Sequence, residues 1–256
     1  MIDTPSSAQK AETLKALHLP GTPVVLYNIW DAGSAGAVAK AGAKALATGS
    51  WSVAEAQGFR DGESLPMEFL FSIVERIVAT NDLPLTVDFE GGYAMAPEEV
   101  SLNVERLISA GAVGLNFEDR VVKGKGLHAI DEQTSRVKAV RAAGDQTGIP
   151  IVINARTDLF LQSKPEDHAS HIPEALERAA AYAEAGGDSF FVPGLSDPDL
   201  IQKVCTESPL PVNVMLRDVT AQIAPLAALG VGRISFGPTP YAVAMKAITE
   251  QAKAFY

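Results

Sequence analysis

The chain has 256 residues, 47% of them hydrophobic and 20% charged, so it can bury a large core and is not expected to be disordered. Its net charge of −10 excludes a broad basic surface for nucleic acid but not a small anionic substrate. Cys205 is the only cysteine, which excludes an intrachain disulfide and fits a reducing cytoplasm. We find neither a signal peptide nor an apolar run of about 18 residues, so we expect a cytoplasmic protein with no membrane contact.

Short apolar runs alternate with longer helical patterns along the chain. An extra N-terminal helix is expected over Ser7–Leu17. Eight later runs are predicted as strands, and they are nearly apolar throughout, as is typical of parallel strands buried on both faces. The predicted strands are Val24–Trp30, Ala45–Ser50, Leu85–Glu90, Ala112–Glu118, Ile151–Arg156, Asp188–Pro193, Val212–Leu216 and Gly232–Phe236.

The segments between these strands carry apolar residues at helical spacing. Several of them end in glycine, as in Ala110-Gly111-Ala112, and a glycine after a helix supplies the left-handed residue that stops it. The predicted helices are Ser34–Ala41, Met67–Asn81, Pro97–Ala110, Glu132–Ala143, Pro173–Ala185, Pro198–Glu207, Ala221–Leu229 and Tyr241–Phe255.

Eight strand–helix units without a long linker predict an α/β fold, a single (β/α)₈ TIM-type barrel domain over residues 1–256. The alternative is a doubly wound open sheet. It is disfavoured because the chain has neither a G-x-G-x-x-G turn after its first strand nor a G-x-x-x-x-G-K-[ST] phosphate loop.

Active sites of such barrels lie at the carboxyl ends of the strands, where this chain places three acids. Asp88 and Glu90 alternate on the third strand, so both side chains are expected on one side of the barrel mouth, with Glu118 on the next strand. Grouped carboxylates repel one another unless a cation binds, and oxygen ligands favour Mg²⁺ or Mn²⁺. The alternative is that these acids cap helices or pair with Arg156.

Arg156 ends the fifth strand, and its planar guanidinium suits a carboxylate or an enolate oxygen. Its alternative role is an ion pair with Asp158 or Glu118. Other candidates at the strand ends are substrate-binding residues, and Ser50, Trp51 and Ser52 form either a carboxylate site or a plain turn. The remaining candidates for this role are Asn28, Trp30 and Asn213.

The loop after the fourth strand is rich in glycine and carries Lys123, Lys125 and His128. Two interpretations of this loop stay open. It is either a mobile lid over the active site or a solvated surface loop.

Together, the motifs at the strand ends resemble those of the isocitrate lyase/phosphoenolpyruvate mutase superfamily, in particular its short bacterial branch. They occur in the family's order and span most of the chain. The matching stretches are Asn28–Ala35, Thr48-Gly49-Ser50, Gly58–Gly62, Asp88-Phe89-Glu90-Gly91-Gly92-Tyr93, Ala110–Asp119 and Asn154-Ala155-Arg156-Thr157-Asp158.

The resemblance implies a barrel whose last helix is swapped between subunits of a homodimer or homotetramer. It implies Mg²⁺ bound by Asp88, with Glu90 and Glu118 acting mostly through water. It further implies that the backbone of Ser50 and Trp51 binds the substrate carboxylate, that Arg156 stabilises the enolate, and that Asp61 is a site residue on a gated segment.

Two stretches depart from the family pattern. The metal motif is Asp-x-Glu where many relatives have Asp-x-Asp, and segment 122–128 lacks both the Lys-Lys-Cys-Gly-His type of lid and the Lys-Thr-Asn-Ser lid. We therefore expect a Mg²⁺-dependent carbon–carbon lyase or decarboxylase that acts on a small 2-oxo or 2-hydroxy carboxylic acid through a metal-bound enolate. The alternatives are phosphoenolpyruvate/phosphonopyruvate phosphomutase-type P–C chemistry and a non-catalytic protein that binds 2-oxo acids.

Overall fold

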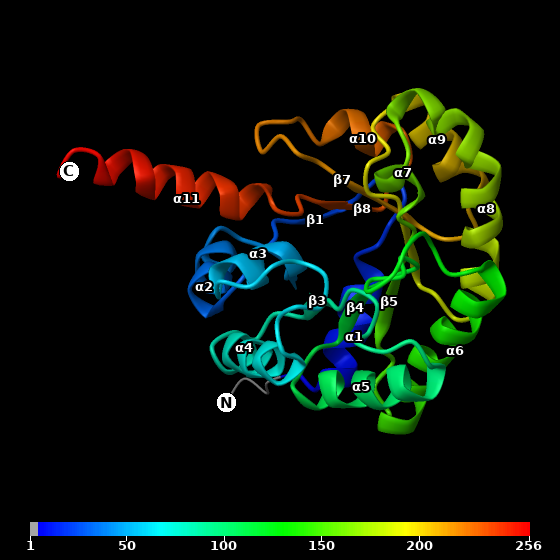
Figure 1. The fold of residues 1–256 in the computed structure, drawn as a ribbon, viewed down its shortest axis with the longest axis horizontal. Coiled ribbons are helices and arrows are strands. Elements are labelled where there is room, and N and C mark those ends of the chain that lie inside the picture. The colour runs from blue at the N-terminus through cyan, green and yellow to red at the C-terminus, as the bar shows by residue number, and fades with distance from the viewer. Residues whose placement is uncertain (1–4) are drawn as a thin grey trace.

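Eight parallel strands form the centre of the molecule in the computed structural model, which describes residues 5–256 (Figure 1). From β2 to β8 each strand pairs with the next in chain order, and β8 also pairs with β1. The strands are β1 (Val24–Leu26), β2 (Leu46–Ala47), β3 (Leu85–Asp88), β4 (Gly114–Glu118), β5 (Val152–Arg156), β6 (Ser189–Phe191), β7 (Val212–Met215) and β8 (Arg233–Ser235).

The sheet closes where the chain passes beyond β1 and β2. A parallel bridge joins Ile29 to Thr48, and the Ile29 N–H donates to the carbonyl of Ala47 at 2.8 Å. This order and closure confirm the predicted (β/α)₈ barrel and exclude the doubly wound sheet, which has two open edges.

Helices follow the strands and cover most of the outside of the barrel. The longer ones overlap the predicted segments, although α6 extends to Thr147, beyond the predicted end at Ala143. Helices α3 and α7 and the short 3₁₀ turn at Pro165–Asp167 were not predicted. The helices are α1 (Ser7–Ala16), α2 (Ala32–Lys40), α3 (Ser50–Ala56), α4 (Met67–Ala79), α5 (Pro97–Ser109), α6 (Ile130–Thr147), α7 (Leu159–Gln162), α8 (His168–Glu184), α9 (Pro198–Glu207), α10 (Ala224–Ala228) and α11 (Thr239–Ala252).

Two predicted boundaries were wrong for identifiable reasons. Helix α8 begins at His168, five residues before the predicted Pro173, and the His168 ring packs against Phe160 and hydrogen bonds its carbonyl oxygen at 3.1 Å. Strand β3 ends at Asp88 instead of Glu90 because Glu90 takes a left-handed backbone angle (φ 51°), which breaks the strand alternation.

The N-terminal helix α1 closes the lower end of the barrel. Its buried residues Ala11 and Leu14 join a separate apolar cluster with Val24, Leu26 and Val152 of the strands. The larger core lies between the strands and the outer helices. The polar groups of the barrel therefore gather at its other end, at the carboxyl ends of the strands.

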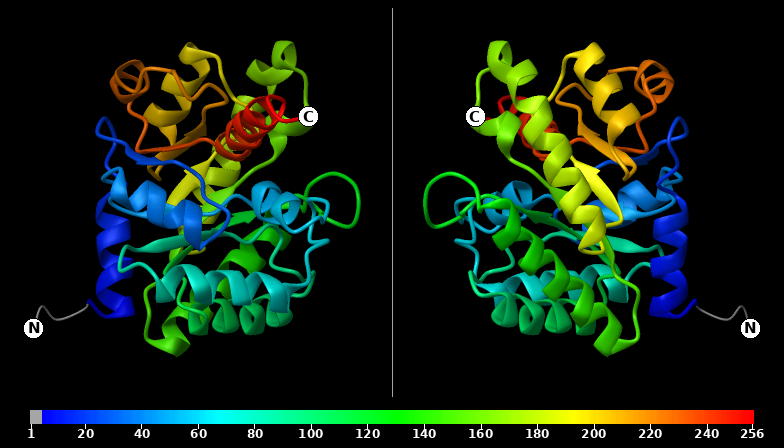
Figure 2. Two further views of the ribbon diagram at one scale, coloured as in Figure 1. Left: turned by 90° about the vertical axis from the view of Figure 1, so that its left-hand side faces the viewer. Right: turned by 90° about the vertical axis from the view of Figure 1, so that its right-hand side faces the viewer.

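The last helix, α11, projects away from the barrel and does not pack along it (Figure 1; Figure 2 shows it end-on). Within α11 only Pro240 is buried, and Val243 and Ile248 are 44% and 60% exposed. In the described residues, none of the helices is both long and apolar enough to cross a membrane.

Candidate active site

A cavity of about 230 Å³ opens at the carboxyl ends of the strands. It brings together residues from both ends of the chain, because β1 and β8 are neighbours in the barrel. Six of the residues predicted for the site line this cavity, namely Asn28, Ser50, Trp51, Asp61, Asp88 and Arg156.

Asp88 presents a carboxylate oxygen without a protein partner. One oxygen, Oδ2, accepts a hydrogen bond from the Ser50 N–H at 3.1 Å. The other, Oδ1, is buried and makes no hydrogen bond, and it lies 3.8 Å from Nη1 of Arg156. A buried carboxylate oxygen without a hydrogen bond is costly, so this atom points to a cation or a donor supplied from outside the chain.

Arg156 is held firmly by two carboxylates. Its Nε and Nη2 donate to the two oxygens of Asp158 at 2.6 and 3.1 Å, and its Nη1 lies 2.8 Å from Glu118 Oε2. Both ion pairs weighed as the alternative role of Arg156 are therefore present. They leave Nη1 as the part of the guanidinium that also faces Asp88, so the pairs orient the arginine within the cavity wall.

Hydrogen bonds of Glu90 and Glu63 join the loop after α3 to the loop after β3. The Glu63 N–H donates to both carboxylate oxygens of Glu90 at 3.0 Å, and the Tyr93 N–H donates to Glu63 Oε1 at 2.8 Å. All three residues have left-handed backbone angles, which are uncommon outside glycine and concentrate at functional sites. These hydrogen bonds hold the loop that carries Asp61 beside the end of β3.

Several carboxyl groups gather around Asp88. Burial, together with Asp61, raises the pKa of Glu90 to about 8, and burial raises the pKa of Glu118 well above its usual range although Arg156 opposes it. Burial and Asp88 also raise the pKa of Asp61. These carboxyl groups outnumber the cationic groups beside them, so a divalent cation would relieve their repulsion.

The three predicted metal residues do not form one cluster of direct ligands. In the described part of the chain, no group of three or more His, Cys, Asp or Glu side chains is placed to hold a metal ion. Of the three, only Asp88 lines the cavity, because Glu90 turns toward Glu63 and Glu118 pairs with Arg156. One carboxylate ligand suits Mg²⁺, which keeps several waters and takes further oxygens from substrates.

Three of the predicted substrate-binding residues lie outside the cavity. Ser52 is buried within α3, and Trp30 packs edge-on against Tyr241 of α11 with ring centroids 5.1 Å apart. Asn213 is buried inside the barrel, where its Nδ2 lies 3.2 Å from Ser235 Oγ.

The predicted lid residues also lie outside the cavity. Loop 120–128 folds back on itself through the Arg120–Leu127 bridge and stands out from the rim of the barrel (Figure 2). Lys123 lies 3.8 Å from Glu63, and Lys125 is exposed. His128 is buried, with Nδ1 2.9 Å from Glu132 of α6, so it anchors the base of the loop.

Several residues of the cavity were not predicted. Asn116 lines it from β4, and Arg217 and Ser235 line it from the end of β7 and from β8. Its remaining wall is largely apolar, with Leu161, Phe191, Pro193 and Met215. A signal was available for Asn116 and Ser235, because a polar residue inside an otherwise apolar barrel strand is unusual and marks an inward position.

The phosphoenolpyruvate phosphomutase family model matches residues 14–256. An uncharacterized protein of Mycobacterium tuberculosis is 33% identical over 93% of this chain and 86% of its own length. The 2-methylisocitrate lyase of Escherichia coli is 28% identical over 77% of this chain and 70% of its own length.

Solved structures agree with this match. A candidate phosphonomutase from Burkholderia cenocepacia superposes with a TM-score of 0.94 at 47% identity, covering 97% of this chain and 99% of that one. A phosphonopyruvate hydrolase in complex with oxalate and Mg²⁺ shares the fold, with a TM-score of 0.83 at 22% identity over 94% of this chain and 84% of its own. This chain therefore belongs to the phosphoenolpyruvate phosphomutase family, within the isocitrate lyase/phosphoenolpyruvate mutase superfamily.

Proposed function

We propose that this protein is a Mg²⁺-dependent carbon–carbon lyase or decarboxylase that acts on a small 2-oxo or 2-hydroxy carboxylic acid. The observation that carries the proposal is the unpartnered Oδ1 of Asp88, buried in a cavity beside Arg156. A volume of about 230 Å³ suits a small acid and excludes a nucleotide-sized ligand.

Different residues of this chain would bind the metal, bind the substrate and stabilise the charge that develops. Asp88 would hold Mg²⁺ directly, with Glu90 and Glu118 supporting it through water. When bound, the ion would supply Lewis-acid stabilisation of negative charge on substrate oxygens. The backbone of Ser50 and Trp51 would bind the substrate carboxylate, and Arg156 would face the oxygen on which charge develops.

The reaction step needs an electron pair to move onto oxygen. In the decarboxylation of a 2-oxo diacid, the bond between C3 and the distal carboxylate breaks and CO₂ leaves. The electron pair stays on C3 and is delocalised as an enolate onto the oxygen of C2, and a proton from solvent then adds to C3. Because Asp158 and Glu118 hold Arg156 in place, its guanidinium would oppose that charge without first having to reorganise. The apolar wall around Phe191 and Met215 would limit water near the enolate.

The test is pyruvate release from a panel of 2-oxo and 2-hydroxy diacids, with Mg²⁺ present and after thorough chelation. We expect turnover of at least one acid, its loss on chelation, and a fall in kcat/KM of roughly 10²-fold or more in Asp88→Ala. Asp82→Ala is the matched control, because the Asp82 side chain is 80% exposed. Turnover that survives chelation, or an active Asp88→Ala protein, would contradict the proposal.

Phosphomutase-type P–C chemistry is a second candidate, favoured by the family match and by the similar candidate phosphonomutase. Incubation with phosphonopyruvate or phosphoenolpyruvate, followed by ³¹P NMR, separates it from the lyase. Conversion of the phosphorus signal without release of pyruvate from the diacid panel would favour the mutase. Mg²⁺-dependent binding of panel members without any turnover would favour a non-catalytic binding protein.

A further inference from the structure

Asn116 forms part of the cavity surface from within β4. Its side chain lines the cavity while the residue as a whole is only 4% exposed. The strand register places it between Asp88 of β3 and Asn154 of β5. Its amide is therefore a neighbour of the carboxylate on which the proposed function depends.

Hydrogen bonds inside the barrel fix which way this amide points. Nη2 of Arg233 donates to Asn116 Oδ1 at 2.9 Å, and Nδ2 of Asn154 donates to the same oxygen at 2.8 Å. A guanidinium has only donors, so the Asn116 atom that faces it has to be the oxygen. The Asn116 NH₂ group is consequently held on the other side of the amide, and it makes no hydrogen bond within residues 5–256.

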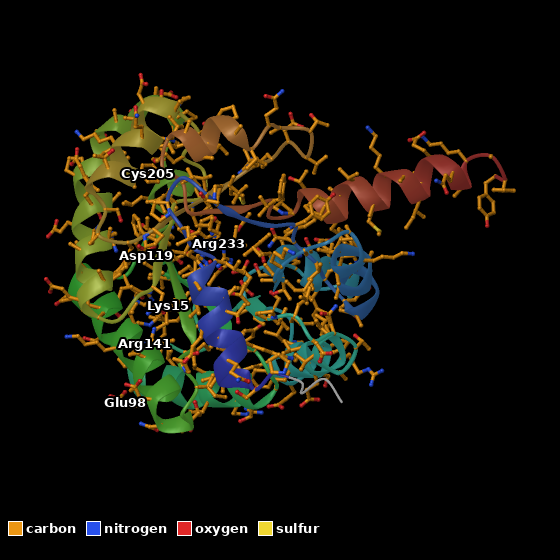
Figure 3. All side chains as sticks on the ribbon, turned by 180° about the vertical axis from the view of Figure 1, so that it is seen from behind. Lys15, Glu98, Asp119, Arg141, Cys205 and Arg233 are labelled. Carbon is orange, nitrogen blue, oxygen red and sulfur yellow. The ribbon has the colours of Figure 1, made fainter. Side chains whose placement is uncertain are left out.

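Arg233 is itself locked beneath the cavity. It is 1% exposed, and its Nη1 lies 3.5 Å from Nε2 of His18, just beyond α1 (Figure 3 shows Arg233 near the end of this helix). Burial lowers the pKa of Arg233 to about 9, so the guanidinium still carries its proton and its donors at neutral pH. Arg233 therefore keeps donating its hydrogen bond to the Asn116 amide oxygen at neutral pH.

The other asparagines of the barrel mouth have their polar atoms engaged differently. Asn28 Oδ1 accepts from the N–H groups of Phe236 and Gly237 at 2.8 and 2.9 Å, and its Nδ2 donates to the Thr48 carbonyl at 2.8 Å. Asn28 therefore joins the ends of β1, β2 and β8. Asn213 does not line the cavity, and its Nδ2 donates to Ser235 Oγ at 3.2 Å. Among these three asparagines, only Asn116 has its NH₂ group free at the cavity.

We propose that Asn116 is a specificity-determining residue whose amide N–H groups bind an oxygen of the substrate carboxylate or oxo group. This inference rests on the proposed function, since it assumes that a small oxygen-rich acid occupies the cavity. Its consequence is selectivity, because a substrate without an oxygen at this position would cover the two amide donors without pairing them.

The experiment is calorimetric titration of oxalate into the full-length protein with Mg²⁺. Asn116→Leu removes the donors at similar volume, and Asn213→Leu makes the same change in the barrel outside the cavity. We expect oxalate affinity to fall about tenfold or more in Asn116→Leu, because hydrogen bonds to charged groups are the stronger ones, and to stay within about twofold in Asn213→Leu. Thermal melts of both proteins check the fold.

Asn116→Leu leaves Arg233 without its acceptor and could therefore fail to fold. A second pair of variants tests the inference in that case. Asn116→Asp keeps acceptors for Arg233 and Asn154 and removes both donors, and Asn213→Asp controls for the added charge. Unchanged affinity in the Asn116 variants, or equal losses in both pairs, would overturn the inference while the proposed function stands. Failure of the wild-type protein to bind oxalate would overturn the proposed function and this inference together.

Discussion

At the end of β3, the backbone angle of one residue separates the roles of two carboxylates. Asp88 is the last residue of β3, and it lines the cavity. Glu90 has a φ of 51°, which turns its carboxylate to the Glu63 N–H. The strand thus contributes one carboxylate to the cavity and uses the other to hold the Asp61 loop in place.

His18 is one residue that should make stability depend on pH below neutrality. Burial and the Arg233 charge lower its pKa to about 4, while its Nδ1 lies 2.8 Å from the Leu14 carbonyl. Between pH 6.5 and 4 the unfolded chain binds a proton that the folded protein excludes, so stability falls as pH falls through this window. Between pH 7 and 5 this residue should cost about 2 kcal/mol of unfolding free energy.

Urea denaturation at pH 7 and pH 5 measures this effect by comparing wild type with His18→Gln. The variant cannot titrate here, so its stability should depend less on pH by about that amount, whatever the buried carboxyl groups contribute to both proteins. If the unfolding free energy of wild type and His18→Gln changed equally between pH 7 and pH 5, His18 would not be held neutral in the folded protein.

The sequence located residues of the cavity better than it placed their side chains. Polar residues at strand ends located Asp88, Arg156, Ser50 and Trp51 in one cavity. Strand alternation, however, placed Glu90 beside Asp88, and the pair Gly91-Gly92 was the signal that a turn begins there. The orientation of Asn116 was beyond prediction, because it depends on Arg233 more than 100 residues away.

Among the elements, α1 has a structural role that the pattern of its sequence does not indicate. It is only weakly amphipathic, yet Ala11 and Leu14 are fully buried against the lower end of the barrel. Position explains this, because a helix that closes a barrel end needs a small apolar contact instead of a long apolar face. Its Ser6 capping box, with hydrogen bonds between Ser6 and Gln9 in both directions, fixes where the helix begins.

Leu14→Ala should therefore destabilise the barrel substantially. The side chain is fully buried between α1 and the strands, and large-to-small changes at such positions cost about 2–5 kcal/mol. Urea denaturation followed by circular dichroism measures the loss. Leu102→Ala on α5, where the side chain is 60% exposed, should change stability by less than about 0.5 kcal/mol. A loss in Leu14→Ala as small as in this control would mean that α1 is dispensable for closing the barrel.

Helix boundaries followed the sequence where a local signal set them. Helix α9 has its predicted bounds because Asp197 caps it and Pro198 begins it. The proline rule failed at α8, because Pro173 lies within the helix and the first turn before it is held by the contact of His168 with Phe160. Helix α3 was missed because Ser50 was assigned to the end of the preceding strand, and Trp51 and Ser52 to the turn after it.

For the whole molecule, the unpacked α11 leaves one side of the barrel bare. Val25 on β1 is 39% exposed, although a helix usually covers the outer face of a barrel strand. A groove of about 480 Å³ lies here, lined largely by apolar residues such as Leu19, Val25, Tyr27 and Val38. Since α11 itself exposes apolar side chains, the two surfaces fit the homo-oligomer with exchanged last helices that the family resemblance implies.

We expect the protein to be a homodimer or homotetramer that depends on α11. Val243 and Ile248 are the large apolar residues exposed on this helix, and charges at both positions, in Val243→Asp combined with Ile248→Asp, should dissociate the assembly to monomers. Size-exclusion chromatography with light scattering measures the mass. Leu102→Asp is the matched control, because this leucine is equally exposed on α5, and it should leave the mass unchanged. A monomeric wild type, or a double variant that keeps the wild-type mass, would rule out assembly through α11. The same mass loss in the control would assign the interface to another face.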